Sequence, residues 1–236
     1  MLGLGVGFYK IGGNDFLGGF SSPKDLPGIL HWWQHDTGLE EDDESAPENG
    51  EDITKWADQV GTEHFIGESN LPTYTSATGT LNFPNSNKFL TIASGTSADI
   101  TLDGDFAVYV RIKFGQTPNS SDIFFKDTDS SNNFLRANSA TVIRAKMSGG
   151  SLNFTVPTMG TSAFYNIGVE RVSGVGHVYV DGTESSTGGL DASAGDWLID
   201  TLQGSKLDEF STMIIVKGSS LSTDDRAALQ IYLAAI

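Results

Sequence analysis

The chain has 236 residues, no cysteine, and 14 Lys and Arg against 30 Asp and Glu, which gives a formal net charge of −16. The lack of cysteine excludes disulfides, thiolate nucleophiles and zinc–thiolate or iron–sulfur sites. Nucleic-acid binding depends mainly on Lys and Arg that neutralise phosphates, so the charge argues against a nucleic-acid partner and against docking on an anionic membrane. No apolar run approaches the ~18 residues of a membrane span.

Residues 1–20 contain seven glycines interleaved with apolar side chains. Glycine loses the most conformational freedom on folding, so the apolar residues between the glycines are expected to need a groove. Two alternatives are open, an extra edge strand on the same domain or an arm that docks on a neighbouring subunit. We assign residues 1–26 to this arm and 27–236 to one domain. The candidate partner-binding residues are Leu2, Leu4, Val6, Phe8, Tyr9, Phe16 and Phe20.

The start of the chain, Met1 to Tyr9, is apolar but has no basic segment and no clean small-residue cleavage site. A secretory signal peptide normally has both features. We therefore interpret this stretch as mature sequence.

Residues 36–52 carry nine acidic side chains and no basic one. Such a block repels itself and indicates a solvated loop. Clustered carboxylates can also bind calcium, the one cofactor that the sequence suggests, but the spacing does not fit an EF-hand. His31 and His35 would share one face of a helix next to Asp36, which is a metal-binding pattern. Residues 30–35 look more like a strand, which favours hydrogen-bonded or surface histidines and predicts no metal site.

Short strands separated by Ser, Asn, Asp and Gly clusters dominate the remainder of the chain. The clearest is 106–114, where Phe106, Val108, Val110, Ile112 and Phe114 alternate with Tyr109, Arg111 and Lys113, so that one face meets the core and the other meets solvent. Asp181-Gly182 predicts a hairpin turn. The other predicted strands are 122–126, 133–137, 141–147, 152–156, 165–172, 177–180 and 213–217.

The last fifteen residues change to helical spacing. Ser222 and Asp225 form an N-terminal capping pattern. An apolar stripe of Leu229, Tyr232, Leu233 and Ile236 follows. We expect one short helix that packs on the sandwich. The predicted fold class is therefore all-β, a jelly-roll sandwich of two antiparallel sheets with a short C-terminal helix.

Several motifs occur in a characteristic order. They are Trp32-Trp33 before Asp36, the segment 53–61, the segment 72–90 leading into 106–114, the segment 165–171 before 178–182, and 208–216 before 221–229. This order resembles the concanavalin A-like lectin/glucanase superfamily, in the laminin G-like form common in phage structural proteins. The resemblance covers about residues 27–236 and implies a jelly roll of two antiparallel sheets.

Members of that superfamily include lectins, glycoside hydrolases and viral structural proteins, so the fold does not decide the function. The Gly-rich arm is similar to capsid decoration or cement proteins of tailed phages. This likeness implies a virion structural protein, made in the host cytoplasm and placed on the capsid surface, with the major capsid protein and neighbouring copies of itself as partners. The alternative is a carbohydrate-binding module of a phage tail or fibre that recognises surface glycans.

Catalysis is not expected. Glucanases of the superfamily carry Glu-x-Asp-x-x-Glu on one strand face, and this pattern does not occur here. Glycoside hydrolysis normally needs two facing carboxylates. Trp33 and Trp56 match core positions of the family pattern. Trp197 follows Gly195-Asp196 in a predicted turn, so it is the candidate for an exposed sugar contact.

Overall fold

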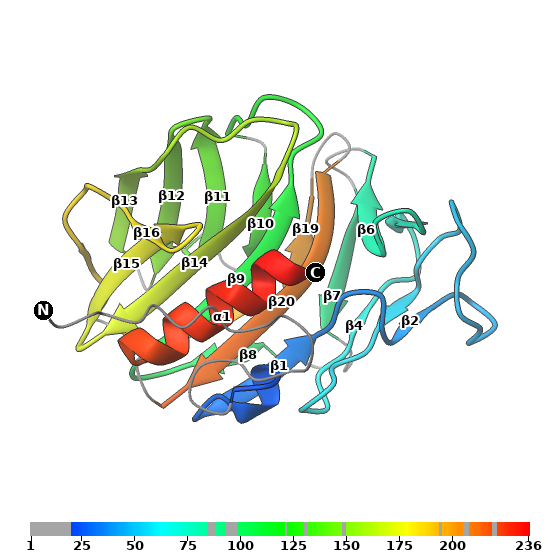
Figure 1. The fold of residues 1–236 in the computed structure, drawn as a ribbon, viewed down its shortest axis with the longest axis horizontal. Coiled ribbons are helices and arrows are strands. Elements are labelled where there is room, and N and C mark those ends of the chain that lie inside the picture. The colour runs from blue at the N-terminus through cyan, green and yellow to red at the C-terminus, as the bar shows by residue number, and fades with distance from the viewer. Residues whose placement is uncertain are drawn as a thin grey trace, which may run out of the picture.

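The computed structural model describes residues 20–84, 88–92, 99–120, 122–129, 132–147, 150–193, 195–204, 208–218 and 221–236. Two large antiparallel sheets face each other, and the C-terminal helix α1 (Thr223–Ala235) crosses the outer face of one of them (Figure 1). The predicted all-β sandwich with one short C-terminal helix is confirmed. The candidate arm residues before Phe20 lie outside the described residues.

Sheet A follows the strand order β16-β15-β14-β9-β20-β6-β5, with β1 paired to β20 and β17 paired to β15. Its strands are β1 (Ile29–Trp33), β5 (Thr73–Thr75), β6 (Thr80–Phe83), β9 (Phe106–Lys113), β14 (Phe164–Val172), β15 (Val175–Val180), β16 (Thr183–Glu184), β17 (Leu190–Asp191) and β20 (Asp208–Lys217).

Sheet B follows the order β13-β12-β11-β10-β19-β7-β4-β3-β2, and β18 pairs separately with β8. The strands of sheet B are β2 (Leu39–Glu40), β3 (Lys55–Trp56), β4 (Phe65–Ile66), β7 (Phe89–Ile92), β10 (Ile123–Lys126), β11 (Phe134–Ser139), β12 (Val142–Met147), β13 (Gly150–Thr155) and β19 (Thr201–Gln203). The separate pair consists of β8 (Ile100–Leu102) and β18 (Trp197–Ile199). A 3-10 turn, η2 (Pro23–Asp25), precedes β1.

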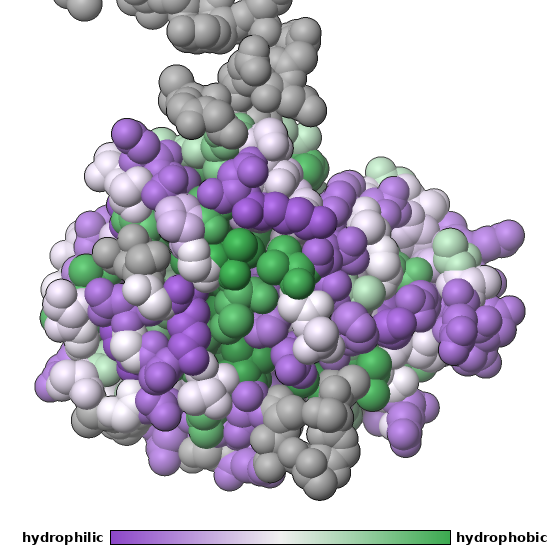
Figure 2. All heavy atoms as spheres, turned by 90° about the horizontal axis from the view of Figure 1, so that it is seen from below, coloured by the Kyte–Doolittle hydropathy of each residue, from purple (hydrophilic) through white to green (hydrophobic). Residues whose placement is uncertain are grey.

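The core lies between the two sheets. Alternate residues of β9, Phe106 to Ile112, point into it and are fully buried, as the period of two predicts. Trp33 and Trp56 are also fully buried, which confirms the expected core role of both. Figure 2 shows the molecule from below, where apolar atoms form only a narrow strip between polar and charged residues.

The opposite face of β9 is solvated only in part, since Arg111 and Lys113 are partly exposed, as the sequence predicted, whereas Ala107 is buried. Tyr109 on this face is buried, because helix α1 covers it with Leu229 and Leu233. These residues form a second apolar cluster together with Trp32 and Ile214. Alternation along one strand identifies two faces, but it does not show that a distant helix covers the second one.

The local signals at the hairpin and at the helix start are confirmed. Asp181 and Gly182 both have positive φ, 49° and 77°, as a type I′ turn requires, and they connect β15 to β16. At the start of α1, the Asp225 backbone N–H donates to Ser222 Oγ at 3.0 Å. This bond satisfies one of the unpaired N–H groups of the first turn.

The domain boundary at residue 27 is too late for the packed structure. Phe20 and Leu26 are buried in the second cluster, and the Phe20 ring lies 6.4 Å from the Tyr232 ring. Phe20 is therefore part of the domain rather than a free partner-binding residue of the arm. In the described part of the chain, no helix is long and apolar enough to span a membrane.

Candidate functional site

An open pocket of about 320 Å³ lies on sheet A next to the last residue of α1. It is lined by Ser211 of β20, Phe164 of β14 and Ile236. Two loops, His35–Asp36 and Ser76–Gly79, supply the remaining lining residues. We call this hollow the α1-end pocket. It brings together five segments that are far apart in sequence.

The two loops hold each other in place. The Asp36 N–H donates to the Gly79 carbonyl at 3.2 Å, and the Tyr74 hydroxyl donates to Asp36 Oδ1. That hydrogen bond to the carboxylate raises the pKa of Tyr74 to about 12. Gly79 has a φ of 60°, and a Cβ there would lie 2.6 Å from His35 Cε1. Glycine is therefore required where the loop meets the imidazole.

His35 contacts a hydroxyl in the pocket, since its Nδ1 lies 3.1 Å from Ser211 Oγ. Burial lowers the pKa of His35, and the nearby Arg111 adds to this while Asp36 opposes it, so the imidazole is neutral at pH 7. A serine nucleophile also needs an acid that orients its histidine. No described carboxylate hydrogen-bonds to His35, so this pair alone does not form a catalytic triad.

An aromatic ring and two cations stand beside this polar wall. Arg111 Cζ lies 4.8 Å and Lys113 Nζ 5.8 Å from the centre of the Phe164 ring. Lys113 also donates to Glu209 at 2.8 Å, and Thr78 donates to the same carboxylate at 2.7 Å. Burial alone would raise the pKa of Glu209, but these hydrogen bonds outweigh it and hold the pKa below its usual value.

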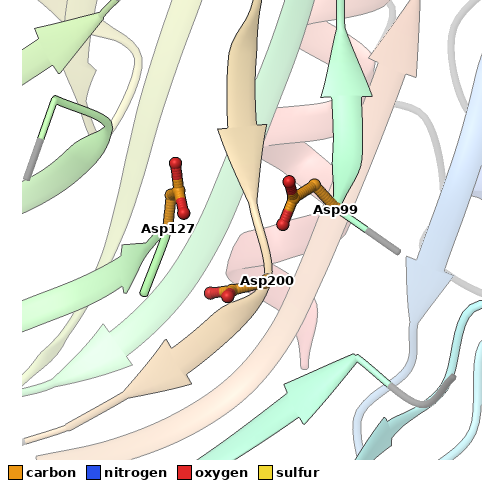
Figure 3. A group of neighbouring side chains, drawn as sticks. All are labelled: Asp99, Asp127 and Asp200. Atoms are coloured by element: carbon orange, nitrogen blue, oxygen red, sulfur yellow. The ribbon is translucent and has the colours of Figure 1, made fainter. Parts of the chain in front are cut away.

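Three carboxylates converge elsewhere, between sheet B and the β8–β18 pair (Figure 3). Asp99 precedes β8, Asp127 follows β10, and Asp200 lies between β18 and β19. One oxygen of each lies within 4.8 Å of the others. Burial raises the pKa of Asp99, and the charges of Asp127, Asp200 and Asp129 raise it further. The group is the one set of described residues whose spacing could hold a metal ion.

Some carboxylate oxygens of this cluster already accept hydrogen bonds from neighbouring residues. Asp127 accepts from the Asp129 N–H at 2.8 Å and from Asn133 Nδ2 at 3.1 Å. Asp200 accepts from the Thr128 N–H at 3.0 Å. Calcium takes six to eight oxygen ligands. The three carboxylates could supply part of such a shell, in a place that the sequence did not indicate, since it suggested calcium only at residues 36–52.

The other candidates from the sequence do not meet at one site. His31 Nδ1 lies 2.6 Å from Asp58 Oδ2 in a buried pair, while His35 contacts Ser211. The hydrogen-bonded interpretation of these histidines is therefore confirmed. Burial alone would raise the pKa of Asp58, but hydrogen bonds from His31 and from the Trp32, Val60 and Gly61 N–H groups lower it below its usual value.

Trp197 is not an exposed sugar contact. Its side chain is fully buried, with its ring stacked 5.4 Å from that of Phe106 and in an edge-to-face contact 5.2 Å from that of Phe125. Its Nε1 donates to the Lys146 carbonyl at 2.9 Å. The prediction is wrong because the Gly195-Asp196 turn places the indole at the start of β18, which faces the core. The turn itself gave no information about which face the next side chain would take.

Comparisons with known proteins support the fold alone. No family model and no curated sequence matches the chain. Trypanosoma rangeli sialidase matches with a TM-score of 0.57 and 11% identity over 88% of this chain and 33% of that one. The binding domain of Botulinum neurotoxin serotype D matches with a TM-score of 0.56 and 10% identity over 88% and 51%.

A third solved structure, the binding domain of Paraclostridial Mosquitocidal Protein 1, matches with a TM-score of 0.51 and 9% identity over 91% of this chain and 53% of that one. This chain has a lectin-like β-sandwich fold. It spans about a third of the sialidase chain and about half of each toxin-domain chain. At these identities, neither the activity of the sialidase nor the binding of the toxin domains transfers to this chain.

Proposed function

We propose that this protein is a non-catalytic carbohydrate-binding module and that the α1-end pocket holds the sugar. The observation that carries the proposal is the composition of the pocket, in which the aromatic ring of Phe164 and the polar side chains of His35, Asp36 and Ser211 line one hollow. The similar structures support it in general terms, because they include a sialidase solved with sialic acid and two binding domains.

The pocket suits the two faces of a sugar ring. Sugar hydroxyl groups both donate and accept hydrogen bonds; among the lining residues, the hydroxyls of Ser211 and Thr78 can do both, and the Asp36 carboxylate can accept. The Phe164 ring offers an apolar surface for the C–H groups of the sugar. The volume of about 320 Å³ is at the lower end of typical small-molecule sites, roughly 300–1,000 Å³.

The same residues are poorly suited to glycoside hydrolysis. That reaction needs a carboxylic acid with a raised pKa opposite a second carboxylate. Glu209 at the pocket has a lowered pKa, because Lys113, Thr78 and Thr80 hydrogen-bond to its charged form. Asp36 is engaged by the Tyr74 hydroxyl. Binding without bond cleavage is the function that this geometry supports.

A glycan array followed by titration calorimetry on the best ligand tests the proposal. We expect Phe164→Ala to weaken binding by about fivefold, in line with the ~1 kcal/mol contributed by an aromatic contact. Phe134→Ala is the matched control, since Phe134 also lies partly exposed beneath two arginines but on sheet B. No ligand on the array, or equal losses for both variants, would contradict the proposal.

A second candidate is a virion structural protein that decorates the major capsid shell and contacts neighbouring copies. It rests on the Gly-rich, apolar composition of residues 1–19 and on the resemblance to decoration proteins given by the sequence. Phe20, the first described residue, packs against Tyr232. Removing residues 1–19 should abolish co-sedimentation with capsids and leave the circular dichroism spectrum unchanged. Retained co-sedimentation would contradict this role of the arm.

A further inference from the structure

The outer face of sheet B concentrates positive charge on three neighbouring strands. In the register of β10, β11 and β12, Lys126 pairs with Phe134, Phe134 with Lys146, and Arg136 with Arg144. Paired residues point to the same side of a sheet. These five residues, which we call the basic face, are all partly exposed. They include four of the 14 basic residues of a chain with net charge −16.

No ion pair with a described carboxylate neutralises the charges of the basic face. Arg136 and Arg144 approach the same Phe134 ring, with Cζ atoms 5.1 and 5.9 Å from its centre. Burial lowers the pKa of Arg136, and the like charge of Arg144 lowers it further. Arg144 Nε donates to Ser151 Oγ at 3.1 Å. None of the four cations forms an ion pair with any described residue.

The complementary charge lies at the other edge of the same sheet. The acidic segment, residues 36–52, contains β2 and carries nine carboxylates. The exposed ones are Asp36, Asp42, Asp43, Glu44, Glu48 and Asp52. Among the described residues, Glu40 is the one member of this segment with an ion pair, to Lys55 of β3. Eight of the nine carboxylates (9 − 1) thus have no ion pair with a described residue, which is twice the number of cations on the basic face.

One molecule cannot bring these two surfaces together. From β10 to β2 the order of sheet B has five steps, through β19, β7, β4 and β3. At ~4.8 Å per step the separation is at least ~24 Å, about three Debye lengths at physiological ionic strength. Figure 1 shows β10, β11 and β12 on the left half of the molecule and the loops around β2 at its right end.

We propose that the basic face of one copy binds the acidic segment of a second copy, head to tail. Such a contact uses different surfaces on the two partners, so it repeats into rings or chains rather than closing as a two-fold dimer. A second copy is favoured over an external polyanion, because the chain itself carries the matching nine carboxylates. At physiological ionic strength the repulsion between the two net charges is screened, while contacts at short range persist.

Sedimentation velocity on the full chain, from micromolar to millimolar concentration in 0.15 M salt, tests the proposal. We expect wild-type protein to self-associate. The double variant Arg136→Glu/Arg144→Glu and the double variant Asp42→Lys/Asp43→Lys should each lose association by at least about tenfold. An equal mixture of the two variants should associate again, because each retains the surface that the other lacks.

The control is Lys24→Glu/Lys217→Glu, which changes the net charge by about −4, as the double arginine variant does, but at other positions, and it should leave association unchanged. Wild-type protein that stays monomeric throughout, or a mixture that fails to associate, would overturn the proposal. A monomeric wild type that binds heparin through Arg136 and Arg144 would likewise overturn it and assign the basic face to an external polyanion. Circular dichroism of each variant confirms that it is folded.

Discussion

Arg226 of α1 neutralises a carboxylate that is completely removed from solvent. Its Nε lies 2.8 Å from Glu170 Oε1 and its Nη2 lies 2.6 Å from Oε2, which makes a two-pronged ion pair. The Tyr109 hydroxyl donates to Oε1 at 2.6 Å. Burial and the Glu170 charge raise the pKa of Tyr109 well above its usual value, so Tyr109 remains a donor. This network joins α1 to β14 and β9.

Replacing Arg226 by methionine would keep the length of the side chain and remove the charge. Glu170 would then stay buried without its cation, and breaking a buried pair in this way costs about 3–5 kcal/mol. The Arg226 side chain is 21% exposed, so water screens part of the interaction and we expect a loss near the lower limit, about 3 kcal/mol. For a chain of this size that corresponds to a fall in Tm of roughly 6–12 °C.

Urea unfolding followed by tryptophan fluorescence measures the loss. The double variant Glu170→Gln/Arg226→Met should recover part of the stability, because it removes the unpaired charge. Arg144→Met is the control, since that arginine is partly exposed and makes one hydrogen bond, to Ser151. A loss below ~1 kcal/mol for Arg226→Met, or an equal loss in the control, would refute a dominant role for the pair.

Three further predictions concern buried polar groups and the corrected tryptophan. The lowered pKa of Asp58 stabilises the fold above the unfolded value near ~3.9, and this contribution is lost as the pH falls through the lower folded pKa. Asp58→Asn should therefore reduce the fall in the urea unfolding midpoint between pH 6 and pH 2. A fall as steep as that of the wild type would contradict this. Asp99 has a raised pKa, so its ionised form destabilises the fold, and Asp99→Asn should raise Tm at pH 7 in a chelator but not at pH 3. A lower Tm for this variant at pH 7 would be inconsistent with carboxylate repulsion. Trp197→Ala should cost about 3–5 kcal/mol of stability and leave the affinity of the folded protein for glycans unchanged in calorimetry, whereas lost affinity with unchanged stability would restore Trp197 as a ligand contact.

The sequence by itself determined the features that depend on neighbours in the chain. Alternation from Phe106 to Phe114 specified a strand with one core face, Asp181-Gly182 specified a type I′ turn, and Ser222 specified the start of α1. In each case the physical cause, side-chain alternation, positive φ or an unpaired N–H group, acts within a few residues. Such signals can be found without knowing where the segment lies in the fold.

Only the tertiary structure decided what covers or surrounds each segment. Tyr109 is buried because a helix more than 100 residues later lies on it, and Trp197 is buried because Phe106 and Phe125 enclose it. The sequence identified His35 and Asp36 as candidate metal-binding residues. It did not identify Phe164 and Ser211, which line the same pocket.

The basic face and the carboxylate cluster also arise from strand register and from loops that meet in space. Charge and burial depend on all neighbours within several ångströms, and in a sandwich of long-range strand pairs most of those neighbours are distant in sequence.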